Sequence, residues 1–316
     1  MIPYDEILRA RDTIAGLVTR TPLVRLDADS DAEIHLKLET LQPVNSFKLR
    51  GAGNAVLQAT DEELAGGVVT ASAGNMAQGV AYAARLRGVP ATIIVPEGAP
   101  ETKIAAVERF GGTAVKLPYD DWWRVLVEGR YEEAAGLFVH PVDDPKVMAG
   151  NGTIGLELLE DLPDVDAVIV PYGGGGLIAG IASAVKATRP DVAFYAVEPV
   201  TGATVRASLD AGHPVEVDYQ RSFVDGAGSR SLILPVWEQH ARDLIDGSLT
   251  VSLEETAAAI RLIAERVRVI AEGAGALATA AALAGKAGGG KIACIVSGGN
   301  IDPQVFCRIL NGETPQ

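Results

Sequence analysis

Short apolar segments alternate with helix-forming segments along this 316-residue chain, and this alternation restricts its fold more than any other feature. The apolar segments are rich in Val, Ile or Ala and are bounded by Gly, Pro or Asp, as buried strands are. We predict strands at residues 34–38, 68–71, 91–95, 114–117, 167–171, 193–197 and 291–297. Strands that are separated by helices form βαβ units and parallel sheets. The chain is therefore predicted to be an α/β protein.

Helix-period segments separate these strands, and the clearest ones are residues 101–110, 252–268 and 273–283. The length predicts two domains, or two lobes of one unit, since a domain usually has about 100–200 residues. Ligands of parallel sheets bind at the carboxyl ends of the strands, where the chain turns into a helix. The strand-to-helix turns are therefore the places where we expect the chemistry.

The charge of the chain argues against a nucleic-acid partner. The sequence has 27 Lys and Arg against 41 Asp and Glu, a net charge of −14, and no basic stripe offsets this acidity. The first eleven residues are polar and acidic, which is unlike a secretory signal. We expect a soluble protein of the cytoplasm.

One uncharged stretch, residues 167–185, has the length of a membrane span, for which about 18 apolar residues suffice. It contains Pro171 and four consecutive glycines, so we predict a strand, a loop and a helix instead of a span. Two cysteines, Cys294 and Cys307, make no disulfide framework, and Cys294 in its apolar run is expected to be a buried thiol. We therefore expect no membrane partner and a reducing compartment.

The first informative turn consists of the four glycines at 173–176, directly after the strand that ends at Pro171. Glycines allow a ligand to approach the backbone, and the helix that follows presents free N–H groups to an anion. The spacing is wrong for a dinucleotide fingerprint, and no Gly-Lys-Ser/Thr follows as in a Walker motif. The turn therefore predicts a site for the phosphate of some other ligand.

The second informative segment is Asn-Ser-Phe-Lys-Leu-Arg-Gly-Ala at 45–52. Ser46 is predicted to cap a helix that carries Lys48 in its first turn, between apolar Phe47 and Leu49. The positive end of a helix dipole lowers the pKa of an ammonium group there and favours the free amine of a Schiff-base lysine. The alternative is a surface lysine on an amphipathic helix.

Two more turns follow predicted strands. Residues 72–79, Ser-Ala-Gly-Asn-Met-Ala-Gln-Gly, are small residues that open a helix, which suits a carboxylate, although an ordinary capping loop has the same composition. Residues 297–300, Ser-Gly-Gly-Asn, place a hydroxyl at a strand end, where it can meet a ring nitrogen or a phosphate.

Together these turns resemble, in order and spacing, the fold-type II pyridoxal-phosphate enzymes, most closely the serine/threonine dehydratase and serine racemase branch. The resemblance covers nearly the whole chain, and its motifs are SFKLRGA at 46–52, SAGNMAQG at 72–79, GGGGLIAG at 173–180, AEGAGA at 271–276 and SGGNID at 297–302. The β-replacement branch is similar in fold but carries a different lysine motif. The resemblance implies a pyridoxal 5'-phosphate cofactor.

The resemblance also implies an architecture like that of the tryptophan synthase β subunit. Two lobes, each with a mainly parallel sheet flanked by helices, would hold the cofactor in the cleft between them. Residues 1–52 and 146–316 would form the large cofactor-binding domain, and residues 53–145 a small mobile domain with the substrate loop. A homodimer or homotetramer is expected.

Residue by residue, the resemblance places Lys48 on the Schiff-base lysine and catalytic base. The positions matching the family's cofactor contacts are Phe47, Lys48, Asn75, Gly173, Gly174, Gly175, Gly176, Leu177, Glu272 and Ser297. The positions matching the substrate loop are Ser72, Ala73, Gly74, Asn75 and Gln78. Ser297 falls on the partner of the pyridine nitrogen, and a neutral hydroxyl there makes a milder electron sink that suits β-elimination.

The activity implied is β-elimination of a β-hydroxy amino acid such as threonine or serine, which yields a 2-oxo acid and ammonia. The alternatives are a racemase or a hydroxyaspartate- or arylserine-specific ammonia-lyase of the same fold. A non-catalytic amino-acid-binding protein is the alternative from another class, but it would have no need of Lys48.

Several residues depart from the family pattern. Ala73 and Met76 stand where the loop usually has serine and histidine, and alanine cannot carry the proton that racemisation needs on the second face. The cation site of the family uses the glutamate at Glu198 and an acid at the position of Thr204, so we predict no metal here.

The pair Trp122-Trp123 lies in the segment that would close over the substrate. Large aromatic residues usually pack in a core or an interface. The functional alternative is an apolar wall for a β-substituent larger than methyl, which would favour threonine over serine, leave room for arylserines and disfavour 3-hydroxyaspartate. The sequence does not decide which tryptophan, if either, faces the cleft.

Overall fold

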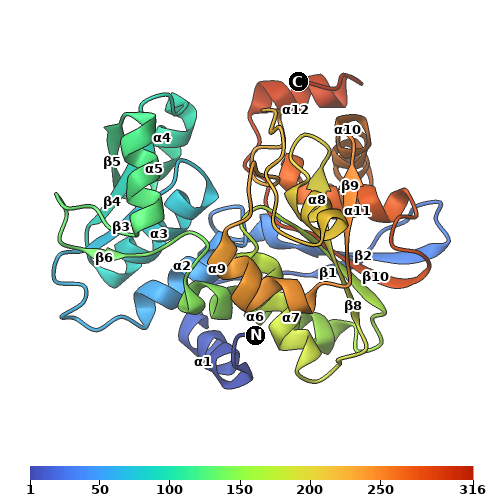
Figure 1. Ribbon diagram of the computed structural model, residues 1–316, viewed down its shortest axis with the longest axis horizontal. Helices are drawn as coiled ribbons and strands as arrows, with labels where there is room; N and C mark the ends of the chain where they lie inside the picture. The colour runs from blue at the N-terminus through green and yellow to red at the C-terminus, as the bar shows by residue number, and fades with distance from the viewer. Residues whose placement is uncertain (316) are drawn as a thin grey trace.

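The structure of the protein is a computed structural model that describes residues 1–315 and contains two β-sheets flanked by helices (Figure 1). Every strand pair is parallel except β1 with β2. The larger sheet consists, in spatial order, of β1 (Leu23–Arg25), β2 (Ala32–Leu38), β10 (Gly290–Val296), β7 (Ala167–Pro171), β8 (Ala193–Pro199) and β9 (Gly247–Val251). The smaller sheet consists of β5 (Gly112–Leu117), β4 (Ala91–Pro96), β3 (Val68–Ala71) and β6 (Leu137–Phe138). The predicted α/β class with two mainly parallel sheets is confirmed.

The α-helices surround the two sheets in separate groups, and Figure 1 shows α3, α4 and α5 around the smaller sheet. The helices are α1 (Tyr4–Ile14), α2 (Lys48–Leu57), α3 (Asn75–Arg87), α4 (Glu101–Arg109), α5 (Tyr119–Glu128), α6 (Pro145–Asp161), α7 (Gly176–Lys186), α8 (Thr204–Ala211), α9 (Leu234–Val236), α10 (Leu253–Leu262), α11 (Gly273–Leu283) and α12 (Pro303–Leu310). Within residues 1–315, no helix is long and apolar enough to cross a bilayer.

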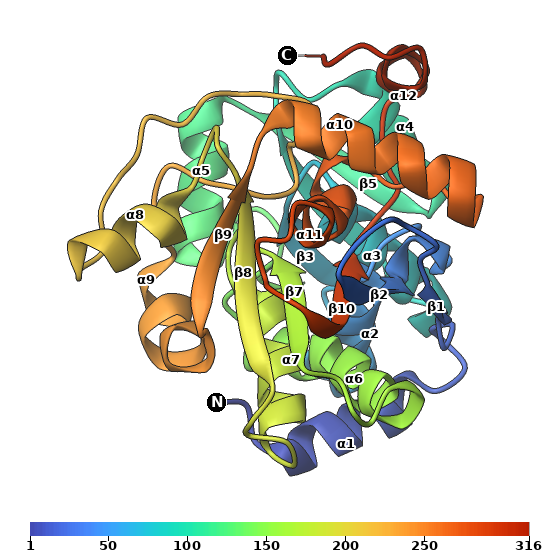
Figure 2. The same cartoon turned by 90° about the vertical axis from the view of Figure 1, so that its right-hand side faces the viewer.

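The larger sheet is buried on both faces, which explains why its central strands β7 and β10 are almost continuously apolar. One face packs against α10 and α11, and the other packs against α6 and α7 (Figure 2). On β10, the side chains of Cys294 and Ile292 face the first layer, whereas those of Ala293 and Ile295 face the second. The Cys294 thiol is fully buried, as predicted.

The seven predicted strands are all present, and their ends lie within two residues of the predicted ends. The strands β1, β6 and β9 were not predicted, because two of them are only two or three residues long and β9 (Gly-Ser-Leu-Thr-Val) is half polar. The predicted helix at 252–268 is α10, which begins at a capping box on Ser252 and continues as a π-helix over Ile263–Val267.

The smaller sheet lies within the predicted small domain, because its strands run from residue 68 to residue 138. Helix α2, however, continues across the predicted boundary at residue 52, and it packs against α3 on one side and α6 on the other. Helix α6 begins close to the second boundary, where the Asp144 carboxylate accepts hydrogen bonds from the N–H groups of Lys146 and Val147. The division into two domains, and the mobility of the smaller one, stay predictions.

Candidate active site

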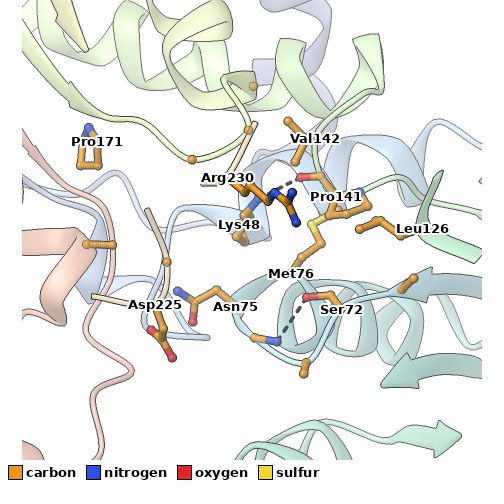
Figure 3. A pocket seen from close by; sticks show the side chains of 18 of the residues that line it. Lys48, Ser72, Asn75, Met76, Leu126, Pro141, Val142, Pro171, Asp225 and Arg230 are labelled. Carbon is orange, nitrogen blue, oxygen red and sulfur yellow. Dashed lines mark hydrogen bonds between the residues drawn. The ribbon is translucent and has the colours of Figure 1, made fainter. Parts of the chain in front are cut away.

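A cavity of about 1300 Å³ lies between the two sheets (Figure 3). Its wall includes the carboxyl ends of β3, β4 and β7 and the turn that follows β10. All the turns that the sequence singles out therefore meet at one site, as expected for parallel sheets whose strand ends face one another. The alternatives for Lys48 and for the 72–79 turn, a surface lysine and an ordinary capping loop, do not fit this placement.

The glycine turn is shaped for an anion. Gly175 has φ +91° and precedes α7, and all four glycines and Leu177 line the cavity. A Cβ on Gly174 would lie 2.5 Å from Cγ1 of Val142, so a side chain would fill the space beside the turn. The first N–H groups of α7 have no partner within the helix. The turn is thus a cradle of backbone donors at the positive end of a helix.

Helix α2 begins at Lys48, so this lysine lies in the first turn, as predicted. The prediction that Ser46 caps the helix is wrong, because its hydroxyl is buried without a partner and no side chain caps α2. Contacts with the 297–300 turn hold the segment instead: Ser46 forms a β-bridge with Gly298, and the N–H of Phe47 donates to the carbonyl of Ser297 over 3.0 Å. A tertiary contact has replaced the local cap.

The amine of Lys48 reaches into the cavity and donates a hydrogen bond to the carbonyl of Pro141 over 2.8 Å (Figure 3). The side chain is partly exposed to the cavity, but the surrounding walls remove most of its water, and this desolvation lowers the pKa to about 8. No carboxylate pairs with this amine in the described part of the chain. Lys48 is therefore poised to act as a neutral amine.

Behind Lys48, helix α2 is anchored by a buried cluster of charges. The Arg50 guanidinium is fully buried and forms paired hydrogen bonds with Glu39 (2.8 and 2.9 Å) and with Glu157 (2.7 and 2.9 Å), and Lys37 also donates to Glu157. Burial alone would raise the pKa of Glu39, but the Arg50 guanidinium brings it below its ordinary value. The cluster joins β2, α2 and α6 beneath the site.

The 72–79 segment runs from the end of β3 into α3, with Gly74 preceding the helix. The Ser72 hydroxyl accepts from the N–H of Gly74 over 3.2 Å, and Ser72, Ala73 and Gly74 all line the cavity. Met76, which is buried, also reaches the wall. Gln78 differs from its predicted neighbours, because it is buried one turn along α3 and is not part of the wall.

Asn75 links the smaller sheet's layer to the larger one. Its amide donates to Glu272 over 2.7 Å, and its carbonyl accepts from the amide of Asn300 over 2.7 Å. Burial, with a smaller contribution from the negative charge of Asp225, raises the pKa of Glu272 to about 7. Asn300 belongs to the Ser-Gly-Gly-Asn turn, but its contact with Asn75 was not predicted. Ser297 and Phe47 complete this side of the cavity.

Comparison with known proteins identifies the family. Residues 14–298 match the family described as pyridoxal-phosphate dependent enzyme. The chain belongs to this family. It is 43% identical to an L-threonine ammonia-lyase of Geobacter sulfurreducens, over 98% of this chain and 78% of that protein. It is 36% identical to an L-threo-3-hydroxyaspartate ammonia-lyase of a Pseudomonas species, over 98% of both. Among solved structures, maize serine racemase matches with a TM-score of 0.89 and 34% identity, over 98% of this chain and 97% of that one.

The cavity of this pyridoxal-phosphate dependent enzyme fits the cofactor of its family. The glycine cradle suits a phosphate, and the desolvated Lys48 amine suits a covalent link to an aldehyde. The Ser297 hydroxyl is buried and neutral, as a partner for a pyridine nitrogen can be. The contacts of the individual residues with the cofactor stay predictions.

Helix α5 supplies a wall that the sequence left undecided. Tyr119, Trp122 and Leu126 line the cavity, whereas Trp123 is 48% exposed and lies outside the wall. The indole N–H of Trp122 is buried and has no hydrogen-bond partner among residues 1–315. Buried donors without a partner are rare in proteins, so this N–H is an unusual feature of the helix.

Glu198 lies outside the cavity and serves another purpose. Its carboxylate accepts from the N–H groups of Val205 (2.9 Å) and Arg206 (3.1 Å) and from the Ser248 hydroxyl (3.2 Å). It therefore caps α8, although burial raises its pKa to about 7. In the described part of the chain, no three acidic, histidine or cysteine side chains are grouped as metal ligands.

Proposed function

We propose that this enzyme eliminates water from a β-hydroxy amino acid such as L-threonine or L-serine and releases a 2-oxo acid and ammonia. The observation that carries the proposal is the position of Lys48, whose desolvated amine lies in the cavity between the glycine cradle and the 72–76 loop. The proposal is also supported by the relatives named L-threonine ammonia-lyase, which match 98% of this chain.

The proposed roles follow from the chemistry of each group. The bound pyridoxal phosphate supplies an electron sink for the Cα atom of the amino acid. Lys48 anchors the cofactor and, once free, removes the Cα proton, because with a pKa of about 8 roughly one amine in ten is neutral at pH 7. The backbone of Ser72 to Asn75 binds the substrate carboxylate, and the cradle at 173–177 holds the phosphate.

Elimination is favoured over racemisation by the side chain at position 73. Racemisation needs a proton donor on the face of the substrate opposite Lys48. The methyl group of Ala73 lines the cavity and carries no proton to donate. A proton removed by Lys48 is therefore not returned to the other face, and loss of the β-hydroxyl is the productive outcome.

The proposal is tested with purified enzyme, pyridoxal phosphate and L-threonine or L-serine, with 2-oxo acid and ammonia measured as products. We expect turnover by the wild type and by Lys146→Ala, an exposed lysine on α6, but none by Lys48→Ala. Borohydride should fix the cofactor on the peptide that contains Lys48. An amino-acid-binding protein would retain the amino acid without producing any 2-oxo acid, and that result would refute the proposal.

We also infer that the enzyme works in the cytoplasm as a homodimer or homotetramer. Two free cysteines, Cys294 and Cys307, suit a reducing compartment. Exposed apolar side chains such as Leu41, Ile270 and Leu310 offer surface for a second copy. Light scattering of the holoenzyme measures the assembly, and a monomer at micromolar concentration would contradict the inference.

A further inference from the structure

One face of helix α5 is directed into the cavity. Tyr119, Trp122 and Leu126 are spaced by three and four residues, so they lie on one side of the helix, and all of them line the cavity. Trp122 and Leu126 also pack against the apolar cluster on one face of the smaller sheet. The positions of Trp122 and Leu126 are thus fixed by packing, whereas Tyr119 at the start of the helix is 56% exposed. We call these three residues the α5 wall.

The α5 wall continues into other apolar groups near Lys48. Met76, Val142 and Pro141 line the same cavity, and Figure 3 shows Met76, Leu126 and Pro141 near one another on the side where Lys48 bonds the Pro141 carbonyl. Methionine adapts its shape to apolar ligands. A substituent that extends from the substrate past Lys48 would therefore contact aliphatic and aromatic side chains.

The charges of the cavity do not favour a second carboxylate on the substrate. Its lining contains five acidic and four basic side chains, and one of the basic ones is Lys48. Of the other cations, Lys103 is paired with Asp225 (2.5 Å) and Arg230 with Glu216 (3.0 Å), whereas Arg221 is exposed to solvent and forms no ion pair within residues 1–315. A β-carboxylate would compete with acids for Lys103 and Arg230, and solvent weakens its attraction to the exposed Arg221. Burying a charge without a close partner is costly.

The size of the cavity leaves space beyond the methyl group of threonine. Pockets for small ligands and cofactors usually measure about 300–1000 Å³. The cavity here measures about 1300 Å³, and it is continuous from the glycine cradle to the α5 wall. This volume must also hold the cofactor, and the part beside the α5 wall is the room that is left for a substituent larger than methyl.

We propose that this enzyme also accepts β-aryl β-hydroxy amino acids such as phenylserine, with the aryl ring held against the α5 wall. The inference rests on the proposed β-elimination. Lys48 takes the Cα proton, the Cβ–O bond breaks, and the hydroxyl leaves as water. Hydrolysis of the resulting imine takes up one water, so phenylserine yields 3-phenyl-2-oxopropanoate and ammonia, and no oxidant or reductant is needed.

The test compares kcat/KM for threonine, phenylserine and 3-hydroxyaspartate in the wild type and in two matched variants. We expect Trp122→Ala to lower kcat/KM for phenylserine about tenfold relative to threonine, which is the effect expected for one aromatic contact. Trp123→Ala removes the neighbouring exposed indole and should change this ratio less than about twofold, the range of ordinary surface substitutions. Equal effects of the two variants would overturn the assignment of the wall.

A second variant keeps the inference testable if Trp122→Ala does not fold. Leu126→Lys adds a cation to the α5 wall, and we expect it to raise kcat/KM for 3-hydroxyaspartate about tenfold relative to phenylserine. No change in this ratio would show that the β-substituent does not reach the α5 wall.

The wild type separates this inference from the proposed function. Threonine turnover without any 3-phenyl-2-oxopropanoate from phenylserine would refute the inference alone, as would a preference for 3-hydroxyaspartate. Failure with every β-hydroxy amino acid by an enzyme that has bound its cofactor would refute the proposed function itself.

Discussion

The substitution Gly175→Ala tests whether the glycine turn is the cradle that we describe. Gly175 has φ +91°, and an alanine there would place Cβ 2.7 Å from the Tyr172 hydroxyl and 3.1 Å from Cγ1 of Val236. The left-handed backbone costs about 1–2 kcal/mol for a residue with a side chain. Forcing a methyl into a packed site costs about 1–3 kcal/mol more. We therefore expect the free energy of unfolding to fall by roughly 2–5 kcal/mol.

The effect on the cofactor should exceed the effect of strain alone. Any shift of the turn moves its N–H groups out of line with the phosphate. A hydrogen bond to a charged group contributes about 1.5–3 kcal/mol. We expect the Kd of pyridoxal phosphate to rise at least about tenfold, which corresponds to 1.4 kcal/mol. Fluorescence titration of the cofactor-free protein, at a temperature where it is folded, measures this Kd.

Gly88→Ala is the matched control for this experiment. Gly88 follows α3 with φ +77°, and a Cβ there would meet no atom within 4 Å. This variant bears the backbone strain without the clash, so it should lose some stability and keep the wild-type Kd. The reasoning is refuted if Gly175→Ala binds the cofactor as tightly as the wild type, or if Gly88→Ala loses affinity equally.

Three further predictions concern the chemistry of the site. The cofactor-free protein should bind pyridoxal phosphate faster as the pH rises through about 8, because only neutral Lys48 attacks the aldehyde. Stopped-flow measurements give the binding rate at each pH, and a midpoint of this rate profile above pH 10 would contradict desolvation of the amine. Ala73→Ser should increase the formation of D-serine from L-serine, whereas the wild type should form far more pyruvate than D-serine, as chiral chromatography can determine. Mg²⁺ or Ca²⁺ should activate weakly or not at all, because Glu198 is occupied by three hydrogen-bond donors; an EDTA-reversible activation that is lost in Glu198→Ala would show otherwise.

The convergence of the turns could be predicted from the sequence because it follows from topology. Once the segments ending at Ala71, Pro171 and Val296 are taken as parallel strands, their carboxyl ends must face the same side of their sheets. The prediction that Ser46 caps α2 is wrong because the contact that replaces the cap is not local. The sequence offers a serine at the position of a cap, but the backbone bridge to Gly298 comes from more than 250 residues away, and no local pattern contains it.

The α5 wall could not be predicted because the sequence of α5 does not define which side of the helix faces the interior. Apolar residues occupy positions 122, 123, 125, 126 and 127, so two adjacent faces of the helix are equally plausible as the inner one. Packing against one face of the smaller sheet selects the helix face with Trp122 and leaves Trp123 exposed. The contact of Asn300 with Asn75 likewise depends on how two distant segments meet.

The buried ions around Arg50 have a consequence for how this enzyme can change over evolution. Removing one member of such a cluster leaves an uncompensated charge in the interior, which typically costs about 3–5 kcal/mol, so its members can be exchanged only together. The buried ion cluster beneath Lys48 should therefore resist single substitutions, whatever the substrate. The residues of the α5 wall are uncharged, and Tyr119 and Trp122 are linked only by a ring contact with 5.6 Å between centroids, so single changes there leave no buried charge behind. New substrate specificities in this scaffold should therefore arise through substitutions in the α5 wall. Directed evolution should randomise positions 119, 122 and 126 and keep the ion cluster around Arg50 unchanged.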